Sequence, residues 1–144
     1  MLAWPTVISN AGAPGRIAHV ATELRACLIA FFVIAAVRLL LSLKGYGWLR
    51  QRLPAAGPAA PSRHYARAVA RRVRRLAPAI PGATCLTQAV SAQYILARSG
   101  HPVRIIIGVR GANREFGAHA WLVCEDEILL GGGPGDYTCI TELT

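Results

Sequence analysis

The strongest constraint on how this chain can fold is an unbroken run of twelve apolar residues, ACLIAFFVIAAV, at positions 26–37. Arg38 interrupts the run, and apolar residues resume at positions 39–43. The surrounding pattern predicts a helix from residue 17 to about residue 44, ended by Gly45-Tyr46-Gly47. A helix that is apolar on every side has to be buried somewhere, so this segment must pack against the rest of the chain, a partner or lipid.

Three interpretations of the apolar run stay open. A transmembrane helix needs roughly 20 apolar residues, a length that positions 26–43 would approach if Arg38 extended toward the membrane surface. A secretory signal has an apolar stretch of similar size, but Arg16 and Arg25 lie unusually deep in the chain for one. We favour the third interpretation, a helix packed in the core or on a partner, with contact to a membrane surface kept as an alternative.

The chain is long enough for one domain, or for one small domain with an extension. Its 144 residues can bury a modest core without disulfides or metal. Residues 53–61 (LPAAGPAAP) contain four helix breakers and are typical of a linker. We therefore divide the chain into an apolar helix with its linker, residues 1–61, and a second unit, residues 62–144.

The charge is strongly basic and unevenly distributed. The formal net charge is +9, and Glu23 is the only acidic residue before Glu115. A predicted helix at residues 63–76 carries six arginines: Arg63, Arg67, Arg71, Arg72, Arg74 and Arg75. Such a helix is most often a solvated face. An acidic partner or lipid head groups would fit it better than nucleic acid, because no aromatic residues or known binding module accompany the charge.

The cysteines indicate free thiols. Cys27, Cys85, Cys124 and Cys139 are widely spaced and form no CxxC motif. Two disulfides are possible by count, but a chain this apolar does not need them, so we predict reduced thiols and a cytoplasmic setting. The same spacing argues against a zinc site, and we expect neither metal nor cofactor.

The second unit begins with two predicted helices. Ser62 can cap the first, and Pro78 and Pro81 end it. Thr84 can cap the second, which runs to about Ser99 and is closed by a glycine at position 100.

Strands follow the helices. Residues 102–110 (PVRIIIGVR) alternate with one apolar face, residues 118–124 form a second strand, and residues 127–130 return after a turn at Glu125-Asp126. The glycines from position 131 onward break this regularity. The order of elements predicts an α+β fold with helices packed on a small antiparallel sheet.

Cys85 and His119 are the candidate chemical pair. Cys85 falls in the first turn of its helix, where the helix dipole and free backbone N–H groups favour a thiolate. His119 lies on the second strand beside Trp121. A thiol at a helix start and a nearby imidazole suffice for nucleophilic catalysis. A small buried cysteine and an ordinary core or surface histidine are the structural alternatives.

Two aspartates are candidates for a third member beside this pair. Asp126 would lie about six residues along the strand from His119, roughly 20 Å away at strand rise. Gly131 or Gly132 would lie opposite the histidine in the hairpin. Asp136, beyond the glycines, is therefore the better candidate, and a backbone carbonyl or a water molecule could also orient the ring.

Several blocks in this order resemble the lasso-peptide maturation B proteins, which are transglutaminase-like cysteine leader peptidases of the microcin-processing type. They are Thr84-Cys85-Leu86, Arg98-Ser99-Gly100-His101-Pro102, the strand RIIIGVR at 104–110, FGAHAW at 116–121, an acidic turn, and Leu130-Gly131-Gly132. The resemblance covers about residues 62–140 and extends to the apolar helix before the catalytic part. It implies a transglutaminase-like or papain-like core in which a cysteine-bearing helix packs on a histidine-bearing sheet.

The resemblance also implies roles. Cys85 would be the nucleophile and His119 the general base of a thiol protease that removes the leader from a lasso precursor peptide, a step in antibiotic biosynthesis. The family's aspartate normally lies near the place where this chain has Leu130-Gly131-Gly132, so a dyad or a displaced Asp136 would replace the usual triad. No leader-binding segment is evident in residues 1–61, which implies a separate small leader-recognition protein, with a lasso cyclase acting next.

Two other functions stay open. A transglutaminase or amidase would use the same thiol and base. A non-catalytic basic module would dock on a membrane or nucleic acid through the arginine-rich helix.

Overall fold

The computed structural model describes residues 16–54, 62–110, 117–132 and 137–143. Within these residues three helices precede four strands, with one short 3-10 turn at Ala77–Ala79 between the second and third helices. The helices are α1 (Arg16–Arg50), α2 (Arg63–Leu76) and α3 (Cys85–Arg98), and the strands are β1 (Val103–Arg110), β2 (Gly117–Cys124), β3 (Glu127–Leu130) and β4 (Tyr137–Leu143).

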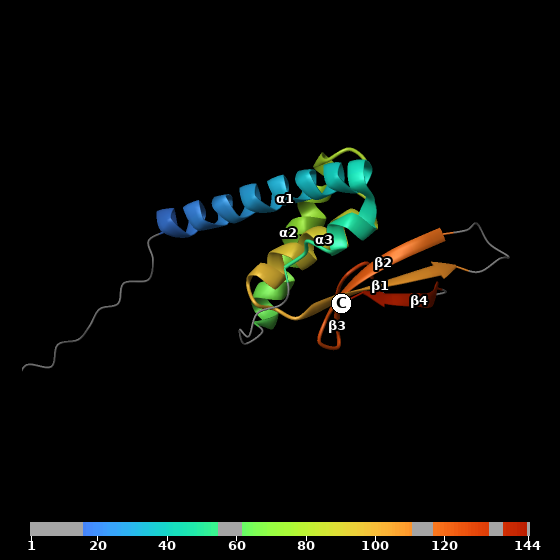
Figure 1. Ribbon diagram of the computed structural model, residues 1–144. Helices are drawn as coiled ribbons and strands as arrows, with labels where there is room; N and C mark the ends of the chain where they lie inside the picture. Colours follow the sequence, from blue (N-terminus) through green and yellow to red (C-terminus); the bar gives the residue numbers. More distant parts are fainter. Residues whose placement is uncertain (1–15, 55–61, 111–116, 133–136, 144) are drawn as a thin grey trace, which may run out of the picture.

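The strands form one antiparallel sheet in the order β3-β2-β1-β4. In this sheet Gly108 of β1 lies opposite His119 of β2, and Leu122 of β2 lies opposite Leu130 of β3. The helices form the other layer: α3 contacts β1 and β2, α2 contacts β3, and α1 lies across α2 and α3 (Figure 1). The predicted α+β fold is therefore confirmed.

Both predicted helix caps are present. The Ser62 hydroxyl accepts a hydrogen bond from the Tyr65 N–H, and the Thr84 hydroxyl accepts one from the Thr87 N–H, each at 3.3 Å. Each cap satisfies one of the backbone donors that a helix start leaves without a partner inside the helix. The second cap fixes where α3 begins and thereby places Cys85 in its first turn.

The core lies between the helices and one face of the sheet. Val73 of α2, Leu96 of α3, and Ile105 and Leu122 of the sheet are fully buried in it. Ile34 of α1 belongs to the same core, so the described part of α1 packs with the elements that follow residue 61. Residues 55–61 of the expected linker lie outside the described residues, and the division into two domains stays a prediction.

Only one side of α1 is packed. Ile34 and Val37 are buried, as the packing prediction requires, but a second apolar stripe faces outward. Among the described residues, α1 is the one helix long and apolar enough to cross a membrane. Only 17% of its most apolar 18-residue segment is buried. Figure 1 shows its N-terminal half projecting beyond the other helices. The exposed stripe comprises Ile17, Val20, Leu24, Leu28, Phe32, Leu39 and Leu43.

Two features of α1 depart from a straight apolar helix: a kink at Gly45 and the charge of Arg38. Gly45 has φ 75° and ψ 171°, so the helix changes direction there before continuing to Arg50, and the predicted stop is a kink. Arg38 points toward the turn before α3: a Cβ added to Gly82 would lie 2.6 Å from its guanidinium. Arg38 also donates to the Ser42 hydroxyl. The charge in the apolar run is thus directed into the domain.

The sequence interpretation missed β4. Tyr137–Leu143 pairs antiparallel with β1, at the edge of the sheet opposite β3. A register shift between Ile107 and Gly108 accommodates this pairing. Much of β4 is exposed, so its sequence lacks the strong apolar alternation that marks a half-buried strand.

Candidate active site

Cys85 is the first residue of α3 and is half-buried. Thr84 precedes it in an extended conformation, and the Thr87 N–H in the first turn is occupied by the Thr84 cap. The thiol therefore lies at a helix N-terminus, where the partial positive charge of the helix favours an anion. Its position agrees with the sequence prediction.

The backbone of Gly131, directly after β3 of the same hairpin, holds the ring of His119. Its Nε2 donates a hydrogen bond of 2.7 Å to the carbonyl oxygen of Gly131. A carbonyl oxygen can only accept, so Nε2 carries the proton and the neutral ring keeps its lone pair on Nδ1. Within the described part of the chain, Nδ1 has no hydrogen-bond partner. None of the described residues thus occupies the nitrogen that a general base would use.

Aromatic rings fix the orientation of the imidazole. The His119 ring lies edge-on to Trp121, with centroids 5.2 Å apart, and is tilted against Tyr137 at 5.6 Å. Trp121 and Tyr137 also pack edge-on, at 5.5 Å. Gly108 provides the space for the indole, because a Cβ there would lie 2.7 Å from its Cζ3 atom. Together with Gly131, these contacts restrain the ring on two sides.

Gly131 occupies a position that a larger residue would disturb. Its φ is +97°, a conformation that side-chain-bearing residues rarely adopt. A Cβ added there would lie 2.7 Å from the Ala120 carbonyl oxygen and 2.8 Å from Cδ1 of Trp121. The absence of a side chain is what allows its carbonyl to approach His119.

Cys85 and His119 line one cavity of about 360 Å³. No hydrogen bond joins the thiol to the ring of these two described residues. Catalytic hydrogen bonds are often longer without substrate and tighten in the complex. The structure therefore brings the predicted pair to one recess. The other lining residues are Arg74, Gln88, Ala120, Ile128, Leu129, Leu130, Gly131 and Gly132.

Comparison with known families identifies the fold. A family model described as the transglutaminase-like superfamily matches residues 33–144. The chain belongs to the transglutaminase-like superfamily. No match was found among curated proteins or among solved structures.

Membership in the transglutaminase-like superfamily places the protein in a group that includes cysteine proteases and acyltransferases, which are typically cysteine-based enzymes. The matched span includes Cys85, His119 and Gly131, together with the C-terminal half of α1. The fold that the sequence resemblance implied is confirmed at the level of the superfamily.

Two cavity residues of this transglutaminase-like domain were missed at the sequence level. Gln88 lies three residues after Cys85, and that spacing puts both on one helix face. Arg74 comes from α2, and nothing in the sequence distinguishes it from the other arginines of that helix. The packing of α2 beside α3 and β3 brings Arg74 to the cavity that Cys85 also lines.

The structure also separates His119 from His101. The buried ring of His101 accepts a 3.0 Å hydrogen bond from the Ser62 N–H at Nε2, so its Nδ1 donates to the Ser99 carbonyl at 3.1 Å. It packs against Tyr65 at 5.2 Å. Both of its nitrogens are therefore engaged in joining the start of α2 to the end of α3, which is a structural role.

The other cysteines differ from Cys85 in their surroundings. Cys124 is buried on the core face of β2, and burial, followed by the nearby carboxylates of Glu125 and Glu127, raises the pKa of its thiol. Cys139 is exposed on β4 and Cys27 is half-buried on α1. All four thiols are free in the structure. Among the described residues, no cluster of three or more His, Cys, Asp or Glu side chains could hold a metal ion.

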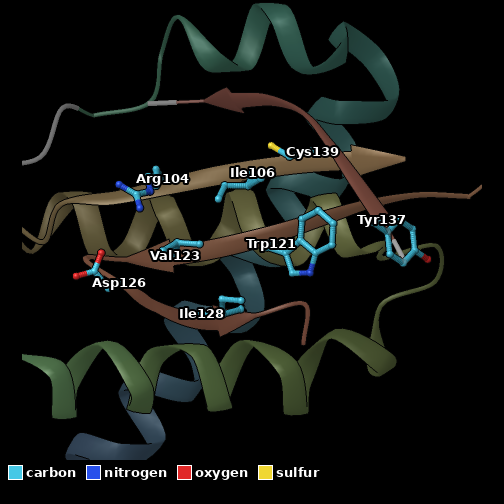
Figure 2. A pocket seen from close by; sticks show the side chains of 8 residues that line it. All are labelled: Arg104, Ile106, Trp121, Val123, Asp126, Ile128, Tyr137 and Cys139. Atoms are coloured by element: carbon cyan, nitrogen blue, oxygen red, sulfur yellow. The ribbon is translucent and has the colours of Figure 1, made fainter. Parts of the chain in front are cut away.

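The structure describes only one of the two aspartates considered as a third member beside Cys85 and His119. Asp136 lies outside the described residues. Asp126 lies in the turn between β2 and β3 and lines a separate groove of about 290 Å³ on the open face of the sheet. Figure 2 shows Asp126 and Arg104 at one end of this groove and Tyr137 at the other, with Trp121 between them. Asp126 is absent from the cavity of Cys85 and His119, as its distance along the strand predicted.

Proposed function

We propose that this protein is a cysteine peptidase that removes the leader from a ribosomally made lasso precursor, so that the core peptide can be cyclised. One observation carries the proposal: Cys85 at a helix start shares a cavity with His119, whose tautomer is set by Gly131. The order of the motif blocks around Cys85 and His119 supports the narrower choice of a leader peptidase within the superfamily.

The proposed reaction begins at Nδ1 of His119, which takes the proton of the Cys85 thiol. The thiolate sulfur attacks the carbonyl carbon of the scissile peptide bond. Backbone N–H groups in the first turn of α3 stabilise the oxyanion; that of Thr87 is already bonded to Thr84, which leaves those of Cys85 and Leu86. The imidazolium then protonates the leaving amine, and water releases the leader from the acyl-enzyme.

Gly131 takes the orienting role in this proposal. A side-chain acid normally fixes the tautomer of a catalytic histidine and stabilises its charged form. The Gly131 carbonyl performs the first of these tasks through its hydrogen bond to Nε2. Asp136 is the alternative orienting group. Slower turnover of Asp136→Asn would assign the orienting role to its side chain, and unchanged turnover would leave that role to Gly131.

Partners follow from the same proposal. The precursor peptide would be presented by a separate small leader-recognition protein, and a lasso cyclase would use the released core. The exposed apolar stripe of α1 would contact a membrane surface or one of these proteins. We propose a cytoplasmic enzyme that is attached peripherally through this stripe.

The first test is site-resolved alkylation with limiting iodoacetamide at pH 7. Cys85 should react at least tenfold faster than Cys139, which is exposed and lies outside the cavity. His119→Ala should remove this advantage and leave Cys139 unchanged. Equal labelling of Cys85 and Cys139 in the wild-type protein, with and without the leader-recognition protein, would count against the site.

The second test is turnover. The wild-type protein, incubated with its precursor and leader-recognition protein, should give two fragments by mass spectrometry, and Cys85→Ala should give none while remaining folded. A product heavier than the substrate would instead identify a transglutaminase. Salt-sensitive binding to vesicles or nucleic acid that survives Cys85→Ala, with no turnover of any precursor, would indicate a docking module.

A further inference from the structure

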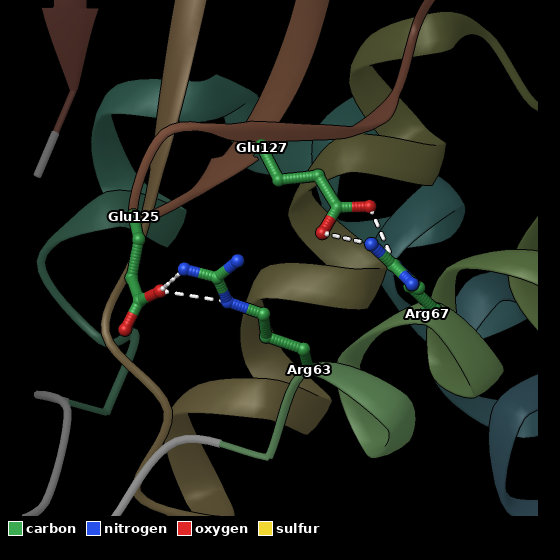
Figure 3. Close-up of polar contacts among 4 residues, drawn as sticks. All are labelled: Arg63, Arg67, Glu125 and Glu127. Atoms are coloured by element: carbon green, nitrogen blue, oxygen red, sulfur yellow. Dashed lines mark hydrogen bonds and ion pairs between the residues drawn. The ribbon is translucent and has the colours of Figure 1, made fainter.

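The arginines of α2 fall into two sets, of which the first is paired within the molecule. Three arginines form ion pairs of 2.7 to 2.8 Å with carboxylates of other elements. Figure 3 shows two of these pairs joining the N-terminal half of α2 to the hairpin of β2 and β3. These arginines attach α2 to its neighbours. The pairs are Arg63–Glu125, Arg67–Glu127 and Arg72–Glu23.

The second set comprises Arg71, Arg74 and Arg75, which are all exposed. Among the described residues, none of the three has an ion-pair or hydrogen-bond partner. Their spacing of three and four residues places them on one face of the helix. The three guanidinium groups therefore form a positively charged surface that the described part of the protein does not neutralise. Like charges at this spacing also repel one another, which favours the binding of an anion.

Arg74 connects this surface to the thiol. It lines the same cavity as Cys85 and Gln88. A ligand that contacts Arg71 or Arg75 on the outside of α2 can therefore extend past Arg74 into the recess. Such a ligand would extend from Arg71 and Arg75 on the surface to Cys85, the candidate nucleophile.

We propose that Arg71, Arg74 and Arg75 bind an acidic segment of the peptide substrate next to the bond that is cleaved. This inference rests on the proposed function and names the class of substrate. Carboxylates match guanidinium groups in charge and in hydrogen-bond geometry.

The spacing on α2 defines how such a segment would look. Arg71 and Arg75 are four residues apart, or about 6 Å along the helix axis. An extended peptide advances about 3.3 Å per residue, so acidic residues two positions apart would match them. A third carboxylate nearer the scissile bond would meet Arg74 in the cavity.

A peptide fits this surface better than the other polyanions. Arg74 lies in a recess of about 360 Å³, which an extended chain can enter and a flat bilayer surface cannot. Nucleic-acid binding would be expected to use stacking aromatic side chains, and the exposed face of α2 between Arg71 and Arg75 carries none. The test below includes both alternatives as outcomes.

The experiment uses the full-length Cys85→Ala protein and two fluorescein-labelled ten-residue peptides. One contains three glutamates at alternating positions, and the other has glutamine in their place. The acidic peptide should bind at least tenfold more tightly in fluorescence anisotropy at 50 mM NaCl. Replacing all three residues (Arg71→Gln, Arg74→Gln and Arg75→Gln) should abolish this preference and reduce the salt dependence.

The control removes the same charge elsewhere. A triple variant with Arg25→Gln, Lys44→Gln and Arg98→Gln changes three exposed cations outside the cavity. It should change the affinity for the acidic peptide by less than twofold. Equal weakening by the two triple variants would overturn the proposal, because net charge alone would then explain binding. Tighter binding of a ten-nucleotide single strand or of anionic phosphatidylglycerol vesicles to the same three arginines would also overturn it.

A second readout separates this inference from the proposed function. In the wild-type protein the acidic peptide should protect Cys85 from iodoacetamide, and Arg74→Gln alone should reduce the protection at least threefold. Binding without protection would overturn the proposal, since the peptide would then lie away from the thiol. Protection of a Cys85 that shows no enhanced reactivity would support this surface while counting against the catalytic role.

Discussion

Gly131 lies against Trp121 so closely that a Cβ on the glycine would be 2.8 Å from Cδ1 of the indole and 3.1 Å from its Cα. The same glycine accepts the hydrogen bond from Nε2 of His119. One residue without a side chain is therefore in contact with the aromatic support of the histidine and determines its tautomer.

The first prediction concerns Gly131→Ala. The added methyl group must displace Trp121 or the edge of the sheet, which would move the carbonyl away from His119. We expect Cys85 alkylation at pH 7, and any precursor cleavage, to slow by about tenfold or more, as when a catalytic base loses its orienting group.

Gly132→Ala is the matched control for this change. Gly132 also has a positive φ, +69°, but a Cβ there would meet nothing within 4 Å. It should cost about 1 kcal/mol of stability from backbone strain and leave alkylation within twofold of wild type. Equal slowing by the two substitutions would show that strain, and not the carbonyl, determines the rate.

The second prediction concerns the cap of α3. Thr84→Ala removes the hydrogen bond to the Thr87 N–H, and Ser62→Ala removes the equivalent bond at α2. Each should lower the free energy of unfolding by about 1 kcal/mol in urea titrations. Only Thr84→Ala should also slow Cys85 alkylation, because it loosens the turn that carries the thiol. Parallel slowing in Ser62→Ala would contradict this assignment.

The third prediction concerns pH. The hydrogen bond from Arg67 lowers the pKa of Glu127 below its ordinary value of 4.5. A carboxyl with a lowered folded-state pKa stabilises the protein above its unfolded pKa and loses this effect as the pH falls through the folded one. The melting temperature of wild type should therefore exceed that of Glu127→Gln near neutral pH, and the two should converge as the pH falls below 4.5 and through the lowered pKa of Glu127.

Arg67→Gln tests the cause of this pH dependence. Without the guanidinium, Glu127 should titrate near its ordinary value, and the difference between variants with and without the carboxylate should become small at every pH. A pH dependence that persists in the Arg67→Gln background would attribute it to another group.

The fourth prediction concerns the outward stripe of α1. Leu24, Leu28 and Phe32 are 51% to 67% exposed. Burying each on a membrane would contribute about 1 to 2 kcal/mol, so replacing all three with serine should weaken flotation with phosphatidylglycerol vesicles at least tenfold. The melting temperature should change little, because these side chains add little to the core.

The control for α1 is the pair Ile128→Ser and Ile140→Ser, which removes exposed apolar side chains from the sheet. It should leave vesicle binding unchanged. If wild type does not float but binds the leader-recognition protein through the stripe, the triple serine variant should lose that complex instead.

The local elements could be predicted because their signals are local. Ser62 and Thr84 at the two caps, the prolines after α2 and the alternation of β1 each act within a few residues, and the helices begin where these signals place them. Cys85 and His119 could be proposed as a pair because their elements were identified correctly.

The remaining features depend on contacts between distant segments. β4 follows a glycine-rich stretch and pairs with β1, about 30 residues away, so its sequence alone gave little sign of it. Arg74 is distinguished from the neighbouring arginines only by which face of α2 meets the cavity. That Gly131 or Gly132 would lie near His119 followed from the hairpin, but the hydrogen bond from Nε2 of His119 to the Gly131 carbonyl could not be predicted from the sequence pattern.

A backbone carbonyl as the partner of His119 has a consequence for how this protein compares with its relatives. A comparison that looks only for a side-chain partner of His119 would not register this carbonyl. Truncating side chains to alanine would not remove the group, because it belongs to the main chain; only an added methyl group, as in Gly131→Ala, disturbs it. What the contact at Gly131 requires is a particular course of the main chain, which a residue carrying a Cβ would disturb.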